Sequence, residues 1–291
     1  MSLAIVAQGH YAASIGEQLP ELKALVKESV GSHVRRIDRF IQLALIGAGR
    51  TAQAGLEAGG VYFASGNGDV EITAELLHSI YQRGEPPKPL SFVNSVSNAA
   101  GFYIGQTLQL HGPSQFVTSR YFALESALQV AALALVQGRV ASALVGAVDG
   151  VLLPMSDHRA RLSLAPETPV AEASFWLQLC ADPGGRPVLA TLDRIWNFAN
   201  VEELQRELPA GALRADANLM FNQFMPEAIR PVCTRHLQKE PLAFESAYGF
   251  YCCQTGELLA QFIEGEAEAL ALVSGDPSGR LQLFEFSKPA R

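Results

Sequence analysis

Residues 112–139 read GPSQFVTSRYFALESALQVAALALVQGR. The β-branched and aromatic run at its start predicts a short strand, and the Ala- and Leu-rich run that follows predicts a helix ending at Gly138. A strand that enters a helix through a tight elbow is a common place for a nucleophile, because the helix N-terminus offers unpaired N–H groups and partial positive charge. Four residues occupy the predicted elbow, and none is a cysteine: Ser119, Arg120, Tyr121 and Phe122.

The segments around this elbow alternate between strand and helix patterns. Strands are predicted at 3–7, 59–69 and 141–150, and helices at 35–59, 71–84 and 95–112. Beyond a Pro-rich polar interval at 154–169, we predict a strand pair (172–180 and 186–198), a helix from Val201, a strand near 217–224, a helix through 245–265 that includes Cys252 and Cys253, and a closing hairpin. This alternation predicts an α/β layered fold in two halves, residues 1–155 and 156–291.

Composition excludes several classes of protein. The 291 residues are 48% apolar, enough for a sizeable core, and the formal net charge of −7 without a long Lys/Arg cluster argues against a nucleic-acid partner. Four cysteines without metal or disulfide spacing predict reduced thiols, and six scattered histidines predict no metal site. No apolar run approaches the length of a membrane span, and the N-terminus lacks the basic start of a signal peptide. We therefore expect a cytoplasmic globular protein.

Five segments, in order and register, resemble the β-ketoacyl synthases, the condensing enzymes of fatty acid and polyketide assembly. They are RRIDRFIQLAL (35–45), GVYFASGNGD (60–69), NSVSNAAGFYIGQTLQLHGPS (94–114), QGRVASALVGAVDG (137–150) and EASFWLQLCADPGGRPVLATLDRI (172–195). The resemblance covers residues 35–196 and is weak beyond residue 200. It implies a thiolase-like α/β/α/β/α fold of two related halves, shortened relative to full-length condensing enzymes, and a dimer.

The resemblance also implies where catalytic residues would stand. The family uses a cysteine thiolate at the elbow to carry the acyl group and two histidines to stabilise the enolate formed on decarboxylation. Counted from Ser114, the cysteine position is Tyr121. The family's Ser-x-x-Gly-His segment resembles SAYGF and places Phe250 at one histidine position, and an anchor on Pro226 places Phe221 at the other. All three positions are aromatic, which predicts a filled pocket, although each residue is also compatible with an ordinary place in the core.

These substitutions favour a non-catalytic accessory subunit, similar to a chain-length factor, that pairs with an active β-ketoacyl synthase in fatty acid or polyketide/polyene biosynthesis, without a cofactor. Two alternatives remain open: an acyl decarboxylase or acyltransferase that works without the cysteine, using Tyr121 and backbone amides of the elbow, and a homodimeric scaffold that binds an acyl carrier protein. The candidate pocket or interface residues are Tyr121, Phe122, Glu125 and Asn98.

Overall fold

The computed structural model describes residues 2–16, 18–52, 59–96 and 98–289. Its strands form one sheet of nine in the order β3-β2-β4-β5-β1-β6-β9-β8-β7. The predicted helix over 35–59 is observed from Arg39 to Ala52, and its expected continuation through 53–58 lies outside the described residues. The strands are β1 (Leu3–Ile15), β2 (Gly60–Ser65), β3 (Ser114–Thr118), β4 (Ser142–Asp149), β5 (Val170–Cys180), β6 (Ala190–Phe198), β7 (Ala217–Phe221), β8 (Ala269–Gly275) and β9 (Leu281–Ser287).

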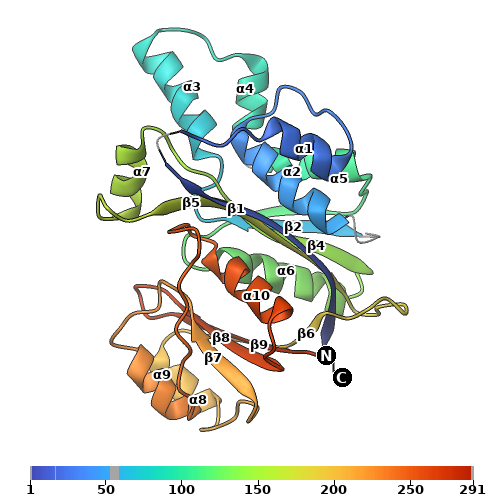
Figure 1. Ribbon diagram of the computed structural model, residues 1–291, viewed down its shortest axis with the longest axis vertical. Coiled ribbons are helices and arrows are strands. Elements are labelled where there is room, and N and C mark those ends of the chain that lie inside the picture. Colours follow the sequence, from blue (N-terminus) through green and yellow to red (C-terminus); the bar gives the residue numbers. More distant parts are fainter. Residues whose placement is uncertain (1, 17, 53–58, 97, 290–291) are drawn as a thin grey trace.

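Helices cover both faces of each half of this sheet and form three layers (Figure 1). Helices α6 and α10 lie between the two halves, α1, α2 and α5 cover the N-terminal half from outside, and α8 and α9 cover the C-terminal half. The α/β/α/β/α layering is therefore confirmed. The helices are α1 (Lys23–Val30), α2 (Arg39–Ala52), α3 (Val70–Gln82), α4 (Pro89–Asn94), α5 (Ala99–Leu108), α6 (Ala123–Val136), α7 (Met155–Leu162), α8 (Val201–Glu207), α9 (Arg230–Leu237) and α10 (Gln254–Glu264).

Strand parity divides the apolar side chains among these layers. In β5, Phe175 and Leu177 pack in the central cluster with α6 and α10, whereas Trp176 packs in the outer cluster with α2. In β8, Leu270 and Leu272 face the centre, and the intervening Ala271 faces the outer helices α8 and α9. Because successive side chains point to opposite faces of a strand, a strand buried on both faces reads as a continuous apolar run.

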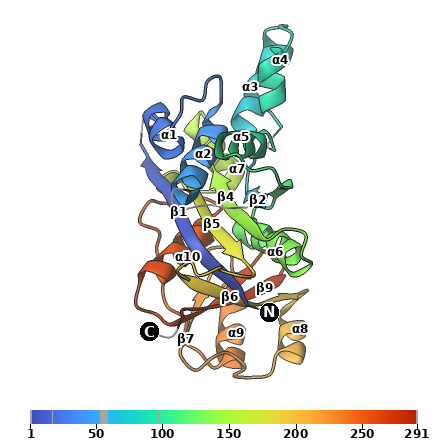
Figure 2. The ribbon, with the colours of Figure 1, turned by 90° about the vertical axis from the view of Figure 1, so that its right-hand side faces the viewer.

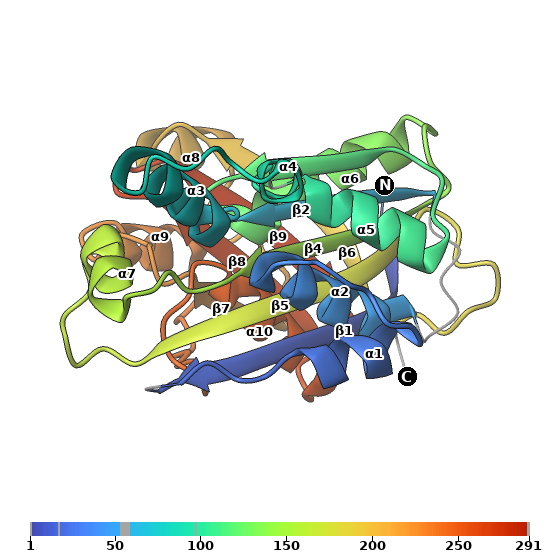
Figure 3. The ribbon, with the colours of Figure 1, turned by 90° about the horizontal axis from the view of Figure 1, so that it is seen from above.

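Strand β1 is longer than predicted and joins the two halves of the sheet. It pairs antiparallel with β5 along its whole length, as Figure 3 shows, and its first residues, Leu3–Ile5, pair with β6. The predicted direct pairing of β5 with β6 is therefore wrong, because β1 lies between them. The connection after β5 crosses the start of β1, where the Leu189 N–H donates to the carbonyl of Ile5 at 2.8 Å.

Two local predictions also need correction. The polar interval 154–169, predicted to lack regular structure, contains α7. Cys252 and Cys253 precede α10 rather than lying inside it, with Cys253 at the N-cap position. The strand β5 lies beyond residue 155 yet pairs with β4 as well as β1. The division into halves at residue 155 stays a prediction.

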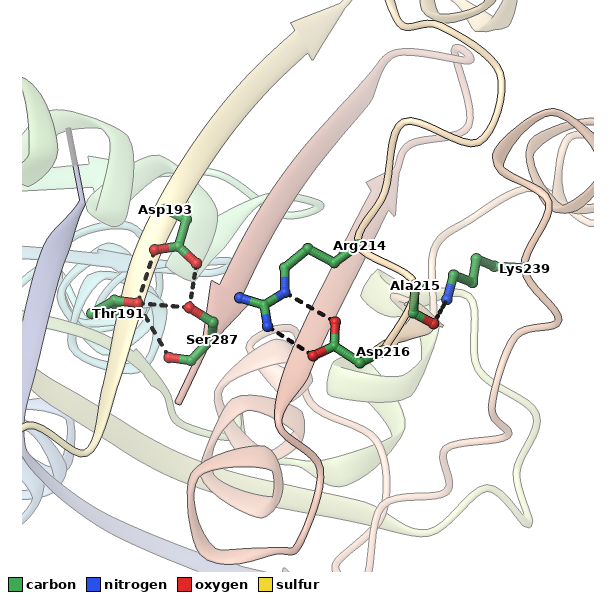
Figure 4. A network of polar contacts seen from close by, with 7 residues as sticks. All are labelled: Thr191, Asp193, Arg214, Ala215, Asp216, Lys239 and Ser287. Atoms are coloured by element: carbon green, nitrogen blue, oxygen red, sulfur yellow. Dashed lines mark hydrogen bonds and ion pairs between the residues drawn. The ribbon is translucent and has the colours of Figure 1, made fainter. Parts of the chain in front are cut away.

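A small polar network fastens β6 to its neighbours next to a β-bulge between Leu192 and Arg194. Asp193 accepts hydrogen bonds from Thr191 at 2.8 Å and from Ser287 of β9 at 2.6 Å (Figure 4). Ser2, just before β1, donates to the same carboxylate at 2.5 Å. One side chain thus links the start of β1 with β6 and β9.

Side chains of the outer layer of the N-terminal half pack around Trp176. This residue is 1% exposed, and its indole N–H donates to the Ser174 hydroxyl at 2.8 Å. Two glycines leave room for its ring. A Cβ atom at Gly146 would lie 2.2 Å from the ring, and one at Gly47 would lie 2.4 Å from it. Because the ring and the strand backbone are both fixed by packing, neither can move aside cheaply.

We therefore expect Gly146→Ala to lower the free energy of unfolding by about 1–3 kcal/mol through overpacking. Urea denaturation followed by tryptophan fluorescence measures the effect. Gly16→Ala is the matched control, because a Cβ atom there meets nothing within 4 Å. Equal stability of the two variants would show that the Trp176 pocket has spare volume.

Candidate functional site

The predicted elbow is present. Strand β3 ends at Thr118 and α6 begins at Ala123, so the intervening residues turn the chain at the end of the sheet. The Ser119 N–H donates to the carbonyl of Ser65 at 3.0 Å, which ties the turn to the end of β2. Tyr121 and Phe122 stand directly before the first turn of α6, with Phe122 as the N-cap residue.

Three aromatic rings from distant parts of the chain meet beside this elbow. The ring of Tyr121 contacts Phe224 edge-to-face at 5.0 Å between centroids, and Phe224 contacts Phe250 in the same way at 5.9 Å. Edge-to-face pairs contribute about 0.5–1.5 kcal/mol each beyond the area they bury. The segments after β7 and before α10 thus meet the elbow through an aromatic row, which we define as Tyr121, Phe224 and Phe250.

Phe221 is not part of this row. It lies on β7, packs in the outer cluster with Ala217 and Leu219, and has the Arg230 guanidinium over its ring at 5.9 Å. Strand parity explains the difference, because alternate β7 residues face the outer helices. The assignment of Phe221 to a family histidine position stays a prediction, and Phe224, three residues later, is the residue whose ring contacts Tyr121. The sequence held a signal for Phe224, since it is the other aromatic residue of the segment FNQF.

Asn222, between these two phenylalanines, holds the elbow to the C-terminal half. It is 2% exposed, and its amide donates to the carbonyls of Tyr121 at 3.1 Å and Gly275 at 3.3 Å. Its side-chain oxygen accepts from the Gly275 N–H at 3.0 Å. The neighbouring Gln223 donates to the carbonyls of Tyr251 and Cys252, both at 3.2 Å. These two amides hold the backbone around the aromatic row, and no local sequence pattern marks either of them as a functional residue.

Glu125 lies one turn inside α6 and is 1% exposed. Ser274 of β8 donates a hydrogen bond to its carboxylate, and Thr255 of α10 does so at 3.4 Å. Burial raises the pKa of this carboxyl from 4.5 to about 7, and the two hydroxyl donors oppose that rise. Glu125 therefore joins α6, α10 and β8 in the interior instead of lining an open pocket.

The other two candidates differ in position. Phe122 is 5% exposed and receives the guanidinium of Arg280 over its ring at 5.8 Å. It therefore contributes to the packing of the elbow against the β8–β9 turn. Asn98 is exposed at the start of α5, in the outer helix layer, and makes no side-chain cap hydrogen bond there. Asn98 does not belong to the aromatic row.

The cysteines of the described chain are all free and buried. Burial raises the pKa of Cys233 to about 12 and that of Cys252 and Cys253 well above the ordinary value. A thiol held in its protonated form is a poor nucleophile. Within the described ranges there is no cluster of three or more His, Cys, Asp or Glu side chains able to hold a metal ion.

A buried carboxyl with a raised pKa makes stability depend on pH. The folded protein binds the Glu125 proton more tightly than the unfolded chain, so this group's contribution is greatest below pH 4.5 and is lost as the pH rises to about 7. We expect Glu125→Gln to remove this dependence. Between about pH 5 and about pH 8, the wild type should lose on the order of 1–3 kcal/mol relative to the variant.

Chemical denaturation at both pH values measures this difference. The exposed Glu227 supplies the control, Glu227→Gln, which should follow the wild type. A Glu125→Gln protein with the pH dependence of the wild type would show that Glu125 does not titrate in this range.

The layered fold and the elbow at the end of its sheet define a thiolase-like α/β protein. The family profile for the N-terminal domain of β-ketoacyl synthases matches residues 9–161. The chain therefore belongs to the β-ketoacyl synthase family. Among curated proteins no sequence gives a significant match.

Solved structures with the same fold share little sequence with the chain. The ishigamide ketosynthase/chain length factor has a TM-score of 0.76 and 16% identity, with 100% of both chains covered. A type II acyl-carrier protein in complex with its ketosynthase, bound to the hexaketide, has a TM-score of 0.74 and 12% identity, with 99% of both chains covered. The PfaC keto synthase–chain length factor has a TM-score of 0.66 and 14% identity, with 100% of this chain and 43% of that chain covered. At these identities the likeness shows the fold alone.

None of the described helices combines the length and the apolar character needed to cross a membrane.

Proposed function

We propose that the protein is a non-catalytic subunit that pairs with an active β-ketoacyl synthase in fatty acid or polyketide assembly. The aromatic row carries this proposal. Tyr121 stands at the position that the resemblance assigns to the family's cysteine, and Phe250, which the resemblance assigns to one histidine position, is linked to it through the ring of Phe224. Phenyl rings neither transfer protons nor donate hydrogen bonds to an enolate oxygen.

The neighbouring structures support the partner class. One is described as a ketosynthase/chain length factor, and another combines a ketosynthase with an acyl-carrier protein. We infer that this chain pairs with a ketosynthase in the same manner and helps to bound the acyl chain, with Tyr121 providing volume near the junction.

The surface around β3 supplies a suitable face for such a partner. Strand β3 is the first strand of the sheet order, so one of its edges is open within the described chain. A hollow of about 510 Å³ links Ser114 of β3 with Gly101 and Phe102 of α5. Beside it, α3 and α4 project from the body of the molecule (Figure 2), and α3 has no buried residue. The exposed apolar side chains of this face include Leu77, Tyr81, Phe92, Val93, Val96 and Phe102.

An apolar face next to an open strand edge suits a permanent protein partner, because large exposed apolar patches are rare on monomers. Aromatic residues at the centre of such a face are expected to contribute most of the binding free energy. We take Phe102, which is 64% exposed and borders the hollow beside β3, as the central contact.

We expect Phe102→Glu to weaken association with the ketosynthase by at least about 2 kcal/mol, or roughly thirtyfold. The partner is first identified by pull-down from the native cell and mass spectrometry, and the affinity is then measured with the two purified proteins. Leu242→Glu is the control, because Leu242 is 51% exposed and lies outside this face. Recovery of a homodimer without any condensing enzyme would contradict the proposal and favour the scaffold alternative.

One observation favours the enzymatic alternative: burial raises the pKa of Glu125 to about 7, which lies in the range of general bases. Its burial and its hydroxyl partners argue against contact with a substrate. One observation favours the scaffold alternative: a surface pocket of about 240 Å³ is lined by Lys23, His33, Arg35 and Arg36. Its basic side chains suit the phosphate of a carrier's prosthetic arm. Both alternatives remain second to the accessory subunit.

We expect the purified protein to release no carbon dioxide from a malonyl-carrier substrate above the rate of the substrate alone, because neither phenylalanine of the aromatic row can stabilise the enolate as the family's histidines do. A radiometric or coupled assay of carbon dioxide measures this. Tyr121→Phe serves as the matched variant and should behave as the wild type. Decarboxylation that disappears in Tyr121→Phe would instead establish the enzyme alternative.

A further inference from the structure

Two arginines lie close to the elbow, and within the described chain only one of their nitrogens has a hydrogen-bond acceptor. Arg120 belongs to the elbow itself, and Arg161 lies in the last turn of α7. Both side chains are half-buried. Among the described residues no ion pair joins either arginine to a carboxylate.

The turn after β2 brings these arginines to one place. Arg161 donates to the side-chain oxygen of Asn67, and Asn67 in turn lies 3.9 Å from the sulfur of Cys252. A Cβ atom at Gly66 would lie 3.5 Å from the Cα atom of Arg120 and 2.3 Å from the Cβ atom of Cys252. Glycine at position 66 therefore permits the close approach of the elbow, the β2 turn and the segment before α10.

The turn is rigid, so the position of Asn67 is fixed before any ligand arrives. The N–H groups of Asn67 and Gly68 both donate to the Ser65 hydroxyl, at 3.1 and 2.8 Å. The Gly66 N–H and the Ser65 hydroxyl donate to one oxygen of Asp149, each at 3.0 Å. The charge of Asp149 acts on Arg161, but these donors hold its carboxylate at the β2 turn, and among the described residues it forms no ion pair with Arg161.

The effect of Arg120 on the pKa of Arg161 is consistent with the two arginines lying near each other. Burial and the neighbouring charge of Arg120 both lower the pKa of Arg161, so the two cations are close enough to repel each other. Half-buried like charges destabilise a fold unless an opposite charge lies between them. A guanidinium also has several N–H donors in a planar fork that fits carboxylate and phosphate oxygens, and only one nitrogen of Arg161 has a protein acceptor among the described residues.

We propose that Arg120 and Arg161, oriented by Asn67, form a binding site for an oxyanion, either a carboxylate or a phosphate group. The site lies beside the elbow, next to the position where the family carries its acyl group. It does not depend on a partner subunit, so the isolated chain is expected to bind the anion. The two possible sources are the carboxylate of an acidic acyl group and the phosphate of a carrier's prosthetic arm.

The test is a titration of the full-length, isotopically labelled protein with malonate and, separately, with inorganic phosphate, each against chloride at equal ionic strength. We expect saturable shifts of the backbone amide signals of Gly66, Asn67 and Arg120. Arg120→Gln and Arg161→Gln should each weaken binding by about tenfold or more, because each removes charge-assisted hydrogen bonds.

Arg235→Gln is the control, since it removes the same charge from an exposed arginine on α9. It should retain wild-type affinity. Binding of malonate but not phosphate would assign the site to an acyl carboxylate, and the reverse result would assign it to a phosphate ester. The proposal is overturned if neither anion shifts these amides more than chloride does, or if both arginine variants bind as the wild type does. If a variant fails to fold, the titration of the wild type still tests whether the site binds an oxyanion.

Discussion

The pairing of β1 with both β5 and β6 is the constraint on which the rest of this structure depends. A strand of 13 residues runs along the N-terminal part of the sheet and extends its first residues into the C-terminal part. The sheet is therefore continuous, and the two halves twist around α6 and α10, which are buried between them. Because α6 follows the elbow directly, the same strand pairing that joins the halves determines which C-terminal segments reach the elbow.

Those segments reach the elbow through polar and aromatic contacts. Asn222 bonds the backbone of the elbow to the end of β8, and Ser274 of β8 donates to Glu125 of α6. Each of these side chains is buried, and a buried polar group is stable only when its partners are present. The region behind the elbow is thus organised as a packed junction, in which the aromatic row lies between buried polar contacts.

The sequence predicted the elements whose signals are local. The helix after the elbow was predicted from its apolar periodicity, and the hairpin of β8 and β9 from the turn residues of SGDPSGR. Both signals lie in short continuous stretches of sequence. The second part of β1 was missed because one of its faces is only partly covered, so its apolar pattern weakens after Ala7. Helix α7 was missed because it is mostly polar.

Local sequence patterns could not predict contacts between segments that lie far apart in the chain. Arg39 begins α2, and it forms a two-point ion pair with the fully buried Glu172 of β5, 133 residues away. The anchor on Pro226 selected Phe221, whereas the ring that contacts Tyr121 is that of Phe224, because a motif anchor counts residues and does not register which face of β7 each side chain occupies.

Two arginines without an ion pair among the described residues lie close to the elbow. In the family, positive potential at the elbow stabilises a thiolate, and this chain has Tyr121 at that position. Arg120 stands directly before Tyr121, and its charge is not balanced by an ion pair within the described chain. Positive charge beside the aromatic row therefore supports the proposal that this elbow binds an anion.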